Sequence, residues 1–220
     1  MARVAVFDAY GTLFDVHSAV RRHATVLGSR ADGVSQLWRA RQLEYSWVST
    51  LAGRYRDFWS LTQDALDHAL AAHGIEDPPL RASLLDAYLA LEAYPEVPGV
   101  LTRLREAGVR TAVLSNGSPM MLERAVKSAA LGDLLDDVLS IDEIQVYKPD
   151  PRVYAFACER LGCTPDAIAF QSSNAWDAAG AAAFGFHVHW INRAGLPREY
   201  AALGPVLPLA DLSTLPALLG

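Results

Sequence analysis

Five short, apolar and partly β-branched segments recur along the chain, and stretches of helical character lie between most of them. Strands that alternate with helices through short connections form a parallel sheet with helices on both faces. The sequence therefore predicts an α/β fold built on a doubly wound parallel sheet. The expected strands are residues 4–7, 110–114, 137–140, 167–171 and 186–190. The expected helices are residues 100–107, 119–130, 151–161 and 177–184.

Residues 16–94 break this alternation, because they contain few β-branched runs and read as successive helices. Apolar residues recur at helical spacing over residues 34–51, and further helices are expected at residues 58–72 and 80–91. A helical cap inserted directly after the first strand would cover the sheet edge at which such folds bind ligands. The predicted division is a Rossmann-like catalytic core, residues 1–15 and 95–220, and an all-helical cap domain, residues 16–94.

Composition and charge restrict the partners and the location. Hydrophobic residues make up 51% and charged residues 20% of the chain, as in an ordinary globular protein. No apolar run approaches the roughly 18 residues that a membrane span needs, so we expect no membrane partner. The N-terminus lacks the features of a signal peptide, which predicts a cytoplasmic protein. A net charge of −6 without a basic stretch argues against nucleic acid as a partner.

Polar clusters follow four of the predicted strands, at the points where these strands end. Parallel strands place these points at one edge of a sheet, so the clusters are expected to converge. Each cluster alone also has a structural explanation, such as an Asx turn at Asp8 or a helix cap at Thr12. Their joint occurrence in this order instead indicates a catalytic site. The clusters are residues 7–13, 114–117, 148–149 and 171–177.

The order of these clusters, with the cap after the first, resembles the four motifs of the haloacid dehalogenase superfamily of hydrolases. The resemblance covers residues 5–14 and 114–186. Most members are magnesium-dependent phosphatases, in which a second Asp stands two residues after the nucleophile and protonates the leaving group. Tyr10 occupies that position here, and Ser173 replaces the first carboxylate of the fourth motif. Because magnesium favours carboxylate oxygens, the sequence predicts no metal and no other cofactor.

The sequence is more similar to the L-2-haloacid dehalogenases of that superfamily. Their Asp-Ala-Tyr-Gly-Thr motif matches residues 8–12, and their Ser-Asn-Gly motif matches residues 115–117. Their Asn-x-x-Asp frame matches residues 174–177, and their Trp-Arg and Gln-Leu-Glu-Tyr-Ser-Trp segments match residues 38–39 and 42–47 in the cap. The resemblance implies hydrolysis of short-chain L-2-haloalkanoic acids to 2-hydroxy acids with inversion at C2. It also implies a homodimer, and it is the sole basis for the stereochemistry.

The resemblance also implies a mechanism through an aspartyl ester. Asp8 attacks C2 and expels the halide, and water then hydrolyses the ester. Lys148 keeps Asp8 ionised, since an adjacent cation favours a carboxylate. Asp177 activates the water, and Arg39 with Asn116 receives the halide. The expected catalytic residues are Asp8, Thr12, Arg39, Lys148, Ser172, Asn174 and Asp177.

The remaining expected roles concern the bound substrate. Ser115 and the backbone amides near Ala9 and Tyr10 are expected to bind the substrate carboxylate. An apolar pocket is expected around the halogen, and the resemblance implies that Tyr154 contacts Lys148. The expected substrate-binding residues are Ala9, Tyr10, Arg39, Leu43, Ser115, Asn116, Tyr154 and Trp176.

Three alternatives stay open at the level of the sequence. A magnesium-dependent phosphatase or phosphonatase would keep the fold and Asp8 but would need the carboxylates that Tyr10 and Ser173 replace. A catalytically silent binding module would have no need for Asp8, Lys148 and Asp177 together. A dehalogenase that acts on D-isomers or on fluorinated acids would carry the same motifs, and the preferred halogen is not specified by them.

Overall fold

A parallel sheet forms the centre of the protein in the computed structural model, which describes residues 4–220. Across these residues six strands lie in the order β3-β2-β1-β4-β5-β6. Strand β1 is central and entirely buried, with Val6 in register with Ala112 of β2 and Phe170 of β4. The strands are β1 Val4–Phe7, β2 Arg110–Ser115, β3 Asp137–Ser140, β4 Ile168–Ser172, β5 His187–Ile191 and β6 Leu207–Leu209. Residues 1–3 of the predicted core lie outside the described residues.

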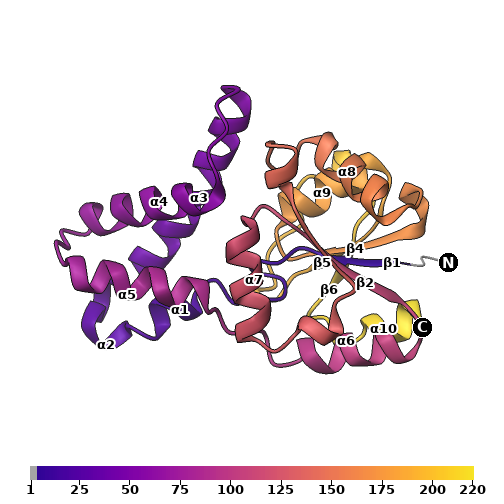
Figure 1. Cartoon of the computed structure of the whole chain (residues 1–220), viewed down its shortest axis with the longest axis horizontal. Helices are drawn as coiled ribbons and strands as arrows, with labels where there is room; N and C mark the ends of the chain where they lie inside the picture. The colour runs from indigo at the N-terminus through magenta and orange to yellow at the C-terminus, as the bar shows by residue number, and fades with distance from the viewer. Residues whose placement is uncertain (1–3) are drawn as a thin grey trace.

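Helices cover both faces of the sheet, which confirms the predicted doubly wound α/β core. Figure 1 shows α6 and α10 on one face and α8 and α9 on the other, with α7 on the side of the inserted helices. These helices are α6 Val97–Glu106, α7 Pro119–Ser128, α8 Pro151–Leu161, α9 Ala175–Phe184 and α10 Leu215–Leu219. Helix α8 is capped at its N-terminus by Asp150, whose carboxylate accepts the Arg152 N–H, and at its C-terminus by Gly162 in the left-handed conformation. Shorter 3-10 helices span Gly28–Arg30, Gly132–Leu134, Ile141–Glu143, Pro165–Ala167 and Ala201–Leu203.

One strand was absent from the sequence-based prediction. Strand β6 is three residues long, contains Pro208 and lies at the edge of the sheet. Proline cannot donate to a strand ladder, so it is tolerated at an edge and weakens the pattern that marks a strand. The five predicted strands form within one residue of their expected limits.

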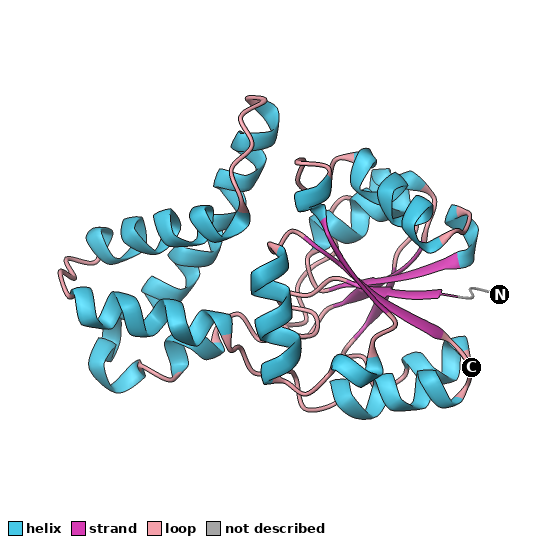
Figure 2. Ribbon diagram, in the orientation of Figure 1, coloured by secondary structure: helices cyan, strands magenta, loops and turns pink. Residues whose placement is uncertain are grey.

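The segment between β1 and α6 is built from helices and loops, as Figure 2 shows. Helices α3 and α4 pack against each other. Asp57 caps α4 by accepting the Ser60 N–H at 3.0 Å, and Asp77 caps α5 by accepting the Leu80 N–H at 2.9 Å. These helices are α1 Ser18–Arg21, α2 Ala24–Leu27, α3 Ala31–Leu51, α4 Phe58–Ala72 and α5 Pro78–Leu89. The limits 16–94 for a separate cap domain stay a prediction.

The two connections between the helical cap and the sheet run side by side. Phe14 and Ala93 form an antiparallel bridge. The Asp15 N–H donates to the Glu92 carbonyl at 2.8 Å, and the Tyr94 N–H donates to the Leu13 carbonyl at 3.0 Å. The outgoing and returning chains therefore hold each other next to the loop that follows β1.

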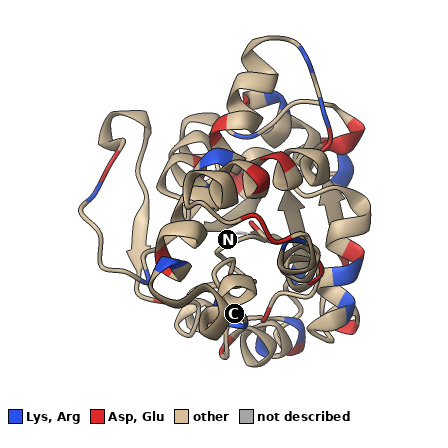
Figure 3. Ribbon diagram, turned by 90° about the vertical axis from the view of Figure 1, so that its left-hand side faces the viewer, with Lys and Arg blue, Asp and Glu red and all other residues tan. Residues whose placement is uncertain are grey.

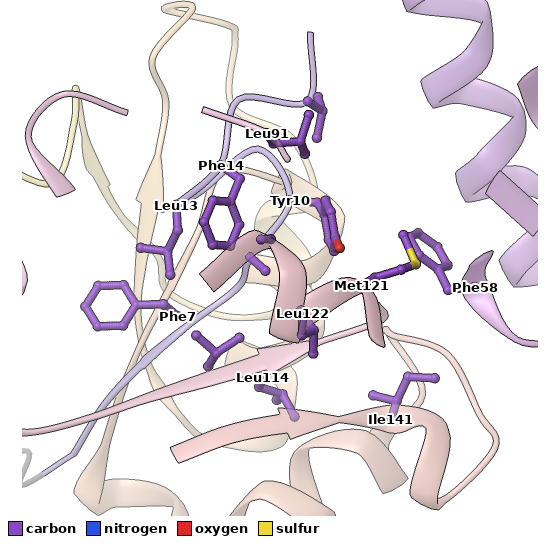
Figure 4. Packing of buried hydrophobic residues seen from close by; sticks show 14 of the residues in the cluster. Phe7, Tyr10, Leu13, Phe14, Phe58, Leu91, Leu114, Met121, Leu122 and Ile141 are labelled. Carbon is purple, nitrogen blue, oxygen red and sulfur yellow. The ribbon is translucent and has the colours of Figure 1, made fainter. Parts of the chain in front are cut away.

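The hydrophobic core continues from the sheet into the cap. Figure 4 shows Phe7, Leu13 and Phe14 packed beside the sheet, with Tyr10 between them and Phe58 of the cap. The ring centroids of Tyr10 and Phe58 lie 6.0 Å apart. The cap is thus seated on the sheet through apolar contacts as well as through its two connections.

Charged positions are interspersed along the helices that surround the sheet, as Figure 3 shows with basic residues in blue and acidic residues in red. A membrane-spanning helix, long and apolar enough to cross a bilayer, is not found within residues 4–220. With a net charge of −6, the protein as a whole does not attract anions, so an anionic ligand would need local cations.

Candidate active site

Asp8 lies at the carboxyl end of the central strand. Its N–H donates to the Gln171 carbonyl at 2.9 Å and so extends the pairing of β1 with β4 by one residue. Beyond this point the Asp8 side chain meets Lys148, whose Nζ lies 3.1 Å from Asp8 Oδ1 and 2.8 Å from Asp177 Oδ2. The exposed fractions are 6% for Asp8, 1% for Lys148 and 0% for Asp177. Two carboxylates thus share one buried cation. The three side chains come from three separate sequence clusters.

The electrostatics of this group keep the lysine charged. Burial lowers the pKa of Lys148, but the charges of Asp177 and Asp8 outweigh it and hold the pKa above its ordinary value. Burial raises the pKa of the Asp177 carboxyl, the Lys148 cation opposes this shift, and the charge of Asp8 adds to it. A carboxyl group with a raised pKa is a stronger base than an ordinary one, so Asp177 is suited to take a proton from water.

Tyr154 contacts the carboxylate oxygen of Asp177 that Lys148 does not contact. Its hydroxyl donates to Asp177 Oδ1 at 2.9 Å. Burial, together with the charge of Asp177, raises the pKa of Tyr154 well above its usual value, so the hydroxyl stays a donor. The structure therefore places the Tyr154 hydroxyl against Asp177, and the contact with Lys148 that the resemblance implies stays a prediction.

The second oxygen of Asp8 is held by two neutral donors. The Thr12 hydroxyl donates to Asp8 Oδ2 at 3.1 Å, and Asn174 Nδ2 donates to the same oxygen at 2.8 Å. The Ser173 N–H donates to Thr12 Oγ1 at 2.8 Å, so the single hydroxyl proton of Thr12 is left for Asp8. Both oxygens of Asp8 are therefore oriented before any substrate binds.

Arg39 reaches from α3 of the cap to the same loops. Its Nη2 donates to the Tyr10 carbonyl at 3.1 Å and to Asn174 Oδ1 at 3.4 Å. Asn174 thus contacts Asp8 with its amide nitrogen and Arg39 with its amide oxygen. The permanent positive charge of Arg39 is therefore linked to Asp8 through the side chain of Asn174.

The remaining polar residues predicted for the site shape its loops. The Asn174 N–H donates to Ser172 Oγ at 3.2 Å, and the Gly117 N–H donates to Ser115 Oγ at 3.0 Å. The Lys148 N–H donates to Asn116 Oδ1 at 3.1 Å, so the Asn116 side chain ties the second cluster to the third. The role of Ser115 and of the Ala9 and Tyr10 amides in binding a carboxylate stays a prediction.

Aromatic residues from both parts of the molecule surround the site. The Tyr10 ring stacks on Tyr88 of α5, with centroids 5.7 Å apart and an interplanar angle of 12°. Trp176 of α9 meets Trp47 of α3 edge to face at 5.3 Å. Leu43 lies one helical turn after Arg39 and is partly buried. A cavity of about 500 Å³ borders this region, and its lining includes Trp47, Tyr147, Lys148 and Trp176.

Three contacts of the site were missed from the sequence. Gln42 Oε1 accepts from Arg39 Nη1 at 2.8 Å and from the Tyr88 hydroxyl at 3.1 Å. Arg193 Nη2 donates to the Thr12 carbonyl at 3.1 Å. Gln42 follows Arg39 by three residues on one helix, a spacing that indicates contact, and Arg193 follows a strand at the catalytic edge. Tyr88 has no comparable signal, because its contact depends on how α5 packs.

A cluster of three or more His, Cys, Asp or Glu side chains able to hold a metal ion is not found in the described part of the chain. The positive charge between Asp8 and Asp177 is supplied by Lys148. Metal-independent chemistry stays a prediction that a chelator experiment can test.

Comparisons with known proteins agree on one group. The sequence model of the haloacid dehalogenase-like hydrolases matches residues 2–185. The chain is 53% identical to (S)-2-haloacid dehalogenase 1 of Pseudomonas sp. (strain CBS-3) over 218 residues, which cover 99% of this chain and 96% of that protein. It is 50% identical, with a TM-score of 0.97, to a dehalogenase crystallised with an intermediate complex, covering 99% of this chain and 97% of the other. It is 38% identical, with a TM-score of 0.90, to the L-2-haloacid dehalogenase of Xanthobacter autotrophicus with chloropropionic acid covalently bound, covering 99% and 98%.

Proposed function

The chain belongs to the haloacid dehalogenase-like hydrolases, and among them to the (S)-2-haloacid dehalogenases, and from this premise we propose a complete reaction for its site. The protein hydrolyses short-chain L-2-haloalkanoic acids to 2-hydroxy acids, with inversion at C2, through an ester on Asp8. The observation that carries this assignment is a buried Asp8 carboxylate that is oriented at both oxygens and paired with Lys148, beside a second carboxylate on the same cation.

In the first step one oxygen of Asp8 forms a bond to C2 of the substrate, while the carbon–halogen bond breaks and the halide leaves with its electron pair. Lys148 pairs with one oxygen of Asp8, and Thr12 and Asn174 hold the other. Holding a nucleophile in such a near-attack pose supplies roughly 7–11 kcal/mol of the reduction in the barrier. Because a halide leaves as an anion, the step needs no proton donor, which accounts for Tyr10 in place of a second acid.

Arg39 supplies the charge that receives the halide. It is the residue of the cap that contacts the Tyr10 carbonyl and Asn174, next to the nucleophile. A fixed cation in a site shielded from water stabilises developing negative charge more strongly than the same cation in solution. Asn116 is proposed to assist Arg39. Its Oδ1 is engaged by the Lys148 N–H, which leaves its Nδ2 donors for the halide.

In the second step water attacks the ester carbonyl of Asp8. Asp177 accepts the proton of the water, a role that suits its raised pKa. Ser172 holds the Asn174 backbone, and Asn174 holds the reacting carboxyl group. The bond between the Asp8 carbonyl carbon and the oxygen on C2 then breaks, and that oxygen takes the second proton of the attacking water, which releases the 2-hydroxy acid. Asp8 returns as a carboxylate, and the proton on Asp177 is released to solvent.

The substrate carboxylate is proposed to bind Ser115 and the amides of Ala9 and Tyr10, and the halogen and the C2 substituent are proposed to lie among Tyr10, Leu43 and Trp176. Ala9 and Tyr10 directly follow Asp8, Ser115 is the last residue of β2, and Leu43 and Trp176 belong to α3 and α9. A homodimer and a cytoplasmic location are further proposals, of which the first is supported by the family.

The test is halide release from L- and D-2-chloropropionate, with and without EDTA, alongside an Asp8→Asn variant. The expected result is chloride from the L-isomer alone, unchanged by EDTA and lost in the variant. Magnesium-dependent phosphate release from phosphoesters, without chloride from either isomer, would replace this function with that of a phosphatase.

A further inference from the structure

Gln42 lies buried inside the cap and connects Arg39 to two other helices. Its Oε1 accepts from Arg39 Nη1 at 2.8 Å and from the Tyr88 hydroxyl at 3.1 Å. Its Nε2 donates to Thr62 Oγ1 at 2.7 Å. The exposed fractions of Gln42 and Thr62 are both 0%. A buried polar link therefore joins α3, α4 and α5 and ends on the guanidinium of Arg39.

The orientation of the Gln42 amide is set by Thr62. The Thr62 hydroxyl donates its single proton to the Phe58 carbonyl at 2.6 Å, so towards Gln42 it can act solely as an acceptor. The amide nitrogen of Gln42 must face Thr62, and its oxygen must face Arg39. Both lone pairs of that oxygen are then used, one by Arg39 and one by Tyr88.

The same link contacts the loop that carries the nucleophile. The ring of Tyr88 stacks on Tyr10 at 5.7 Å and packs against Trp38 at 4.9 Å. The Tyr10 carbonyl accepts from the second terminal nitrogen of Arg39 at 3.1 Å. Arg39 is therefore fixed from the core side by Tyr10 and from the cap side by Gln42.

We propose that Gln42, anchored by Thr62 and Tyr88, is a positioning residue that holds the Arg39 guanidinium where the departing halide meets it. The inference rests on the proposed function in one respect, because it takes the halide to be the ligand of Arg39. The neutral amide orients Arg39 without cancelling its charge. A carboxylate at this position would form a buried ion pair with Arg39 and would compete with the halide.

Two substitutions at Gln42 separate orientation from charge. Gln42→Leu removes the acceptor for Arg39, and Gln42→Glu keeps the shape but adds the competing charge. We expect kcat to fall about 100-fold in each, since a small misplacement of a charged group costs that much. KM should change little, because the substrate carboxylate binds elsewhere. Gln36→Glu is the matched control, as it adds the same charge on an exposed position of α3.

The leaving group provides a readout that a purely structural role would not move. Chloride is a poorer leaving group than bromide and depends more on Arg39, so both Gln42 variants should slow L-2-chloropropionate more than L-2-bromopropionate. Thr62→Val, which removes the anchor of the amide, should show the same preference with a smaller loss. Tyr88→Phe removes one donor to Gln42 and leaves the aromatic stack in place.

The experiment combines these rate constants with chloride binding to the intact protein, followed by line broadening in chlorine NMR. Folded Gln42→Glu protein that loses chloride binding, and that loses more activity on the chloro than on the bromo acid, supports the proposal. Equal losses on both acids with chloride binding as in wild type overturn it. If the Gln42 variants do not fold, Thr62→Val and Tyr88→Phe decide by the same two criteria. If wild type releases no halide, the proposed function fails, and the chloride titration still shows whether Gln42 sets the anion affinity of Arg39.

Discussion

Lys148 Nζ lies closer to Asp177, at 2.8 Å, than to the nucleophile Asp8, at 3.1 Å. We therefore expect the lysine to act in both steps of the proposed reaction. While Asp8 is a carboxylate, its charge adds to the raised pKa of Asp177. Once Asp8 is esterified it carries no charge, and Lys148 is left to stabilise the ionised form of Asp177, which is the form that accepts a proton from water.

Asp177→Asn is expected to stop the reaction after its first step. The amide cannot take a proton from water, so turnover should fall about 100- to 10,000-fold while the aspartyl ester still forms. Mass spectrometry of protein quenched with L-2-chloropropionate should show a stoichiometric adduct on the Asp8 peptide. Asp166→Asn, at an exposed position, serves as the control. Absence of the adduct in folded Asp177→Asn protein would assign Asp177 to the first step instead.

Lys148→Met is expected to lower stability as well as abolish halide release. The substitution leaves two buried carboxylates without their cation, and the loss of one partner of a buried ion pair costs about 3–5 kcal/mol. The free energy of unfolding from a urea titration measures this effect. Lys127→Met removes an exposed lysine and should change stability by less than about 0.5 kcal/mol. Equal free energies of unfolding for the two variants would show that the buried ion pairs of Lys148 do not contribute to stability.

Tyr154→Phe is expected to move the acid limb of ester hydrolysis to higher pH. Asp177 must be ionised to act as a base, so hydrolysis should rise as pH increases through the pKa that Asp177 has while Asp8 is esterified. The Tyr154 hydroxyl donates to Asp177 and favours the ionised form, and its removal should therefore raise that pKa further. Single-turnover decay of the ester against pH gives the midpoint. A midpoint that stays in place, or moves to lower pH, contradicts this role.

Gly180→Ala tests the packing behind the catalytic lysine. A Cβ atom at Gly180 would lie 2.6 Å from the Tyr154 hydroxyl and 2.7 Å from Pro149 Cβ, so both must move. Such overpacking costs typically about 1–3 kcal/mol, and halide release should fall with it. Gly99→Ala, in the exposed first turn of α6, has nothing within 4 Å and should be neutral or slightly stabilising. Thermal melting and halide release of both variants check the pair.

The fold was predictable from local patterns, because apolar β-branched runs and helical spacing mark its strands and helices. The core of the site was predictable for a different reason: the strands are parallel, so clusters at their ends, such as those of Asp8 and Asp177, must meet at one edge. The contacts of Tyr154 with Asp177 and of Gln42 with Tyr88 were not predictable. They depend on how one helix is rotated against another, which no spacing along a single element records.

The bridge between Phe14 and Ala93 has a consequence for how such a protein can be built and altered. Since the chain leaves the core and returns to it at one point, the helical segment is attached to the sheet like the loop of a short hairpin, whose two ends lie side by side. The length and the content of the segment are then free to change without moving the strands on either side. In a scaffold of this kind the helical segment between β1 and α6 can be replaced as a module, together with Arg39. Asp8, Asp177 and Lys148 belong to the core and stay in place.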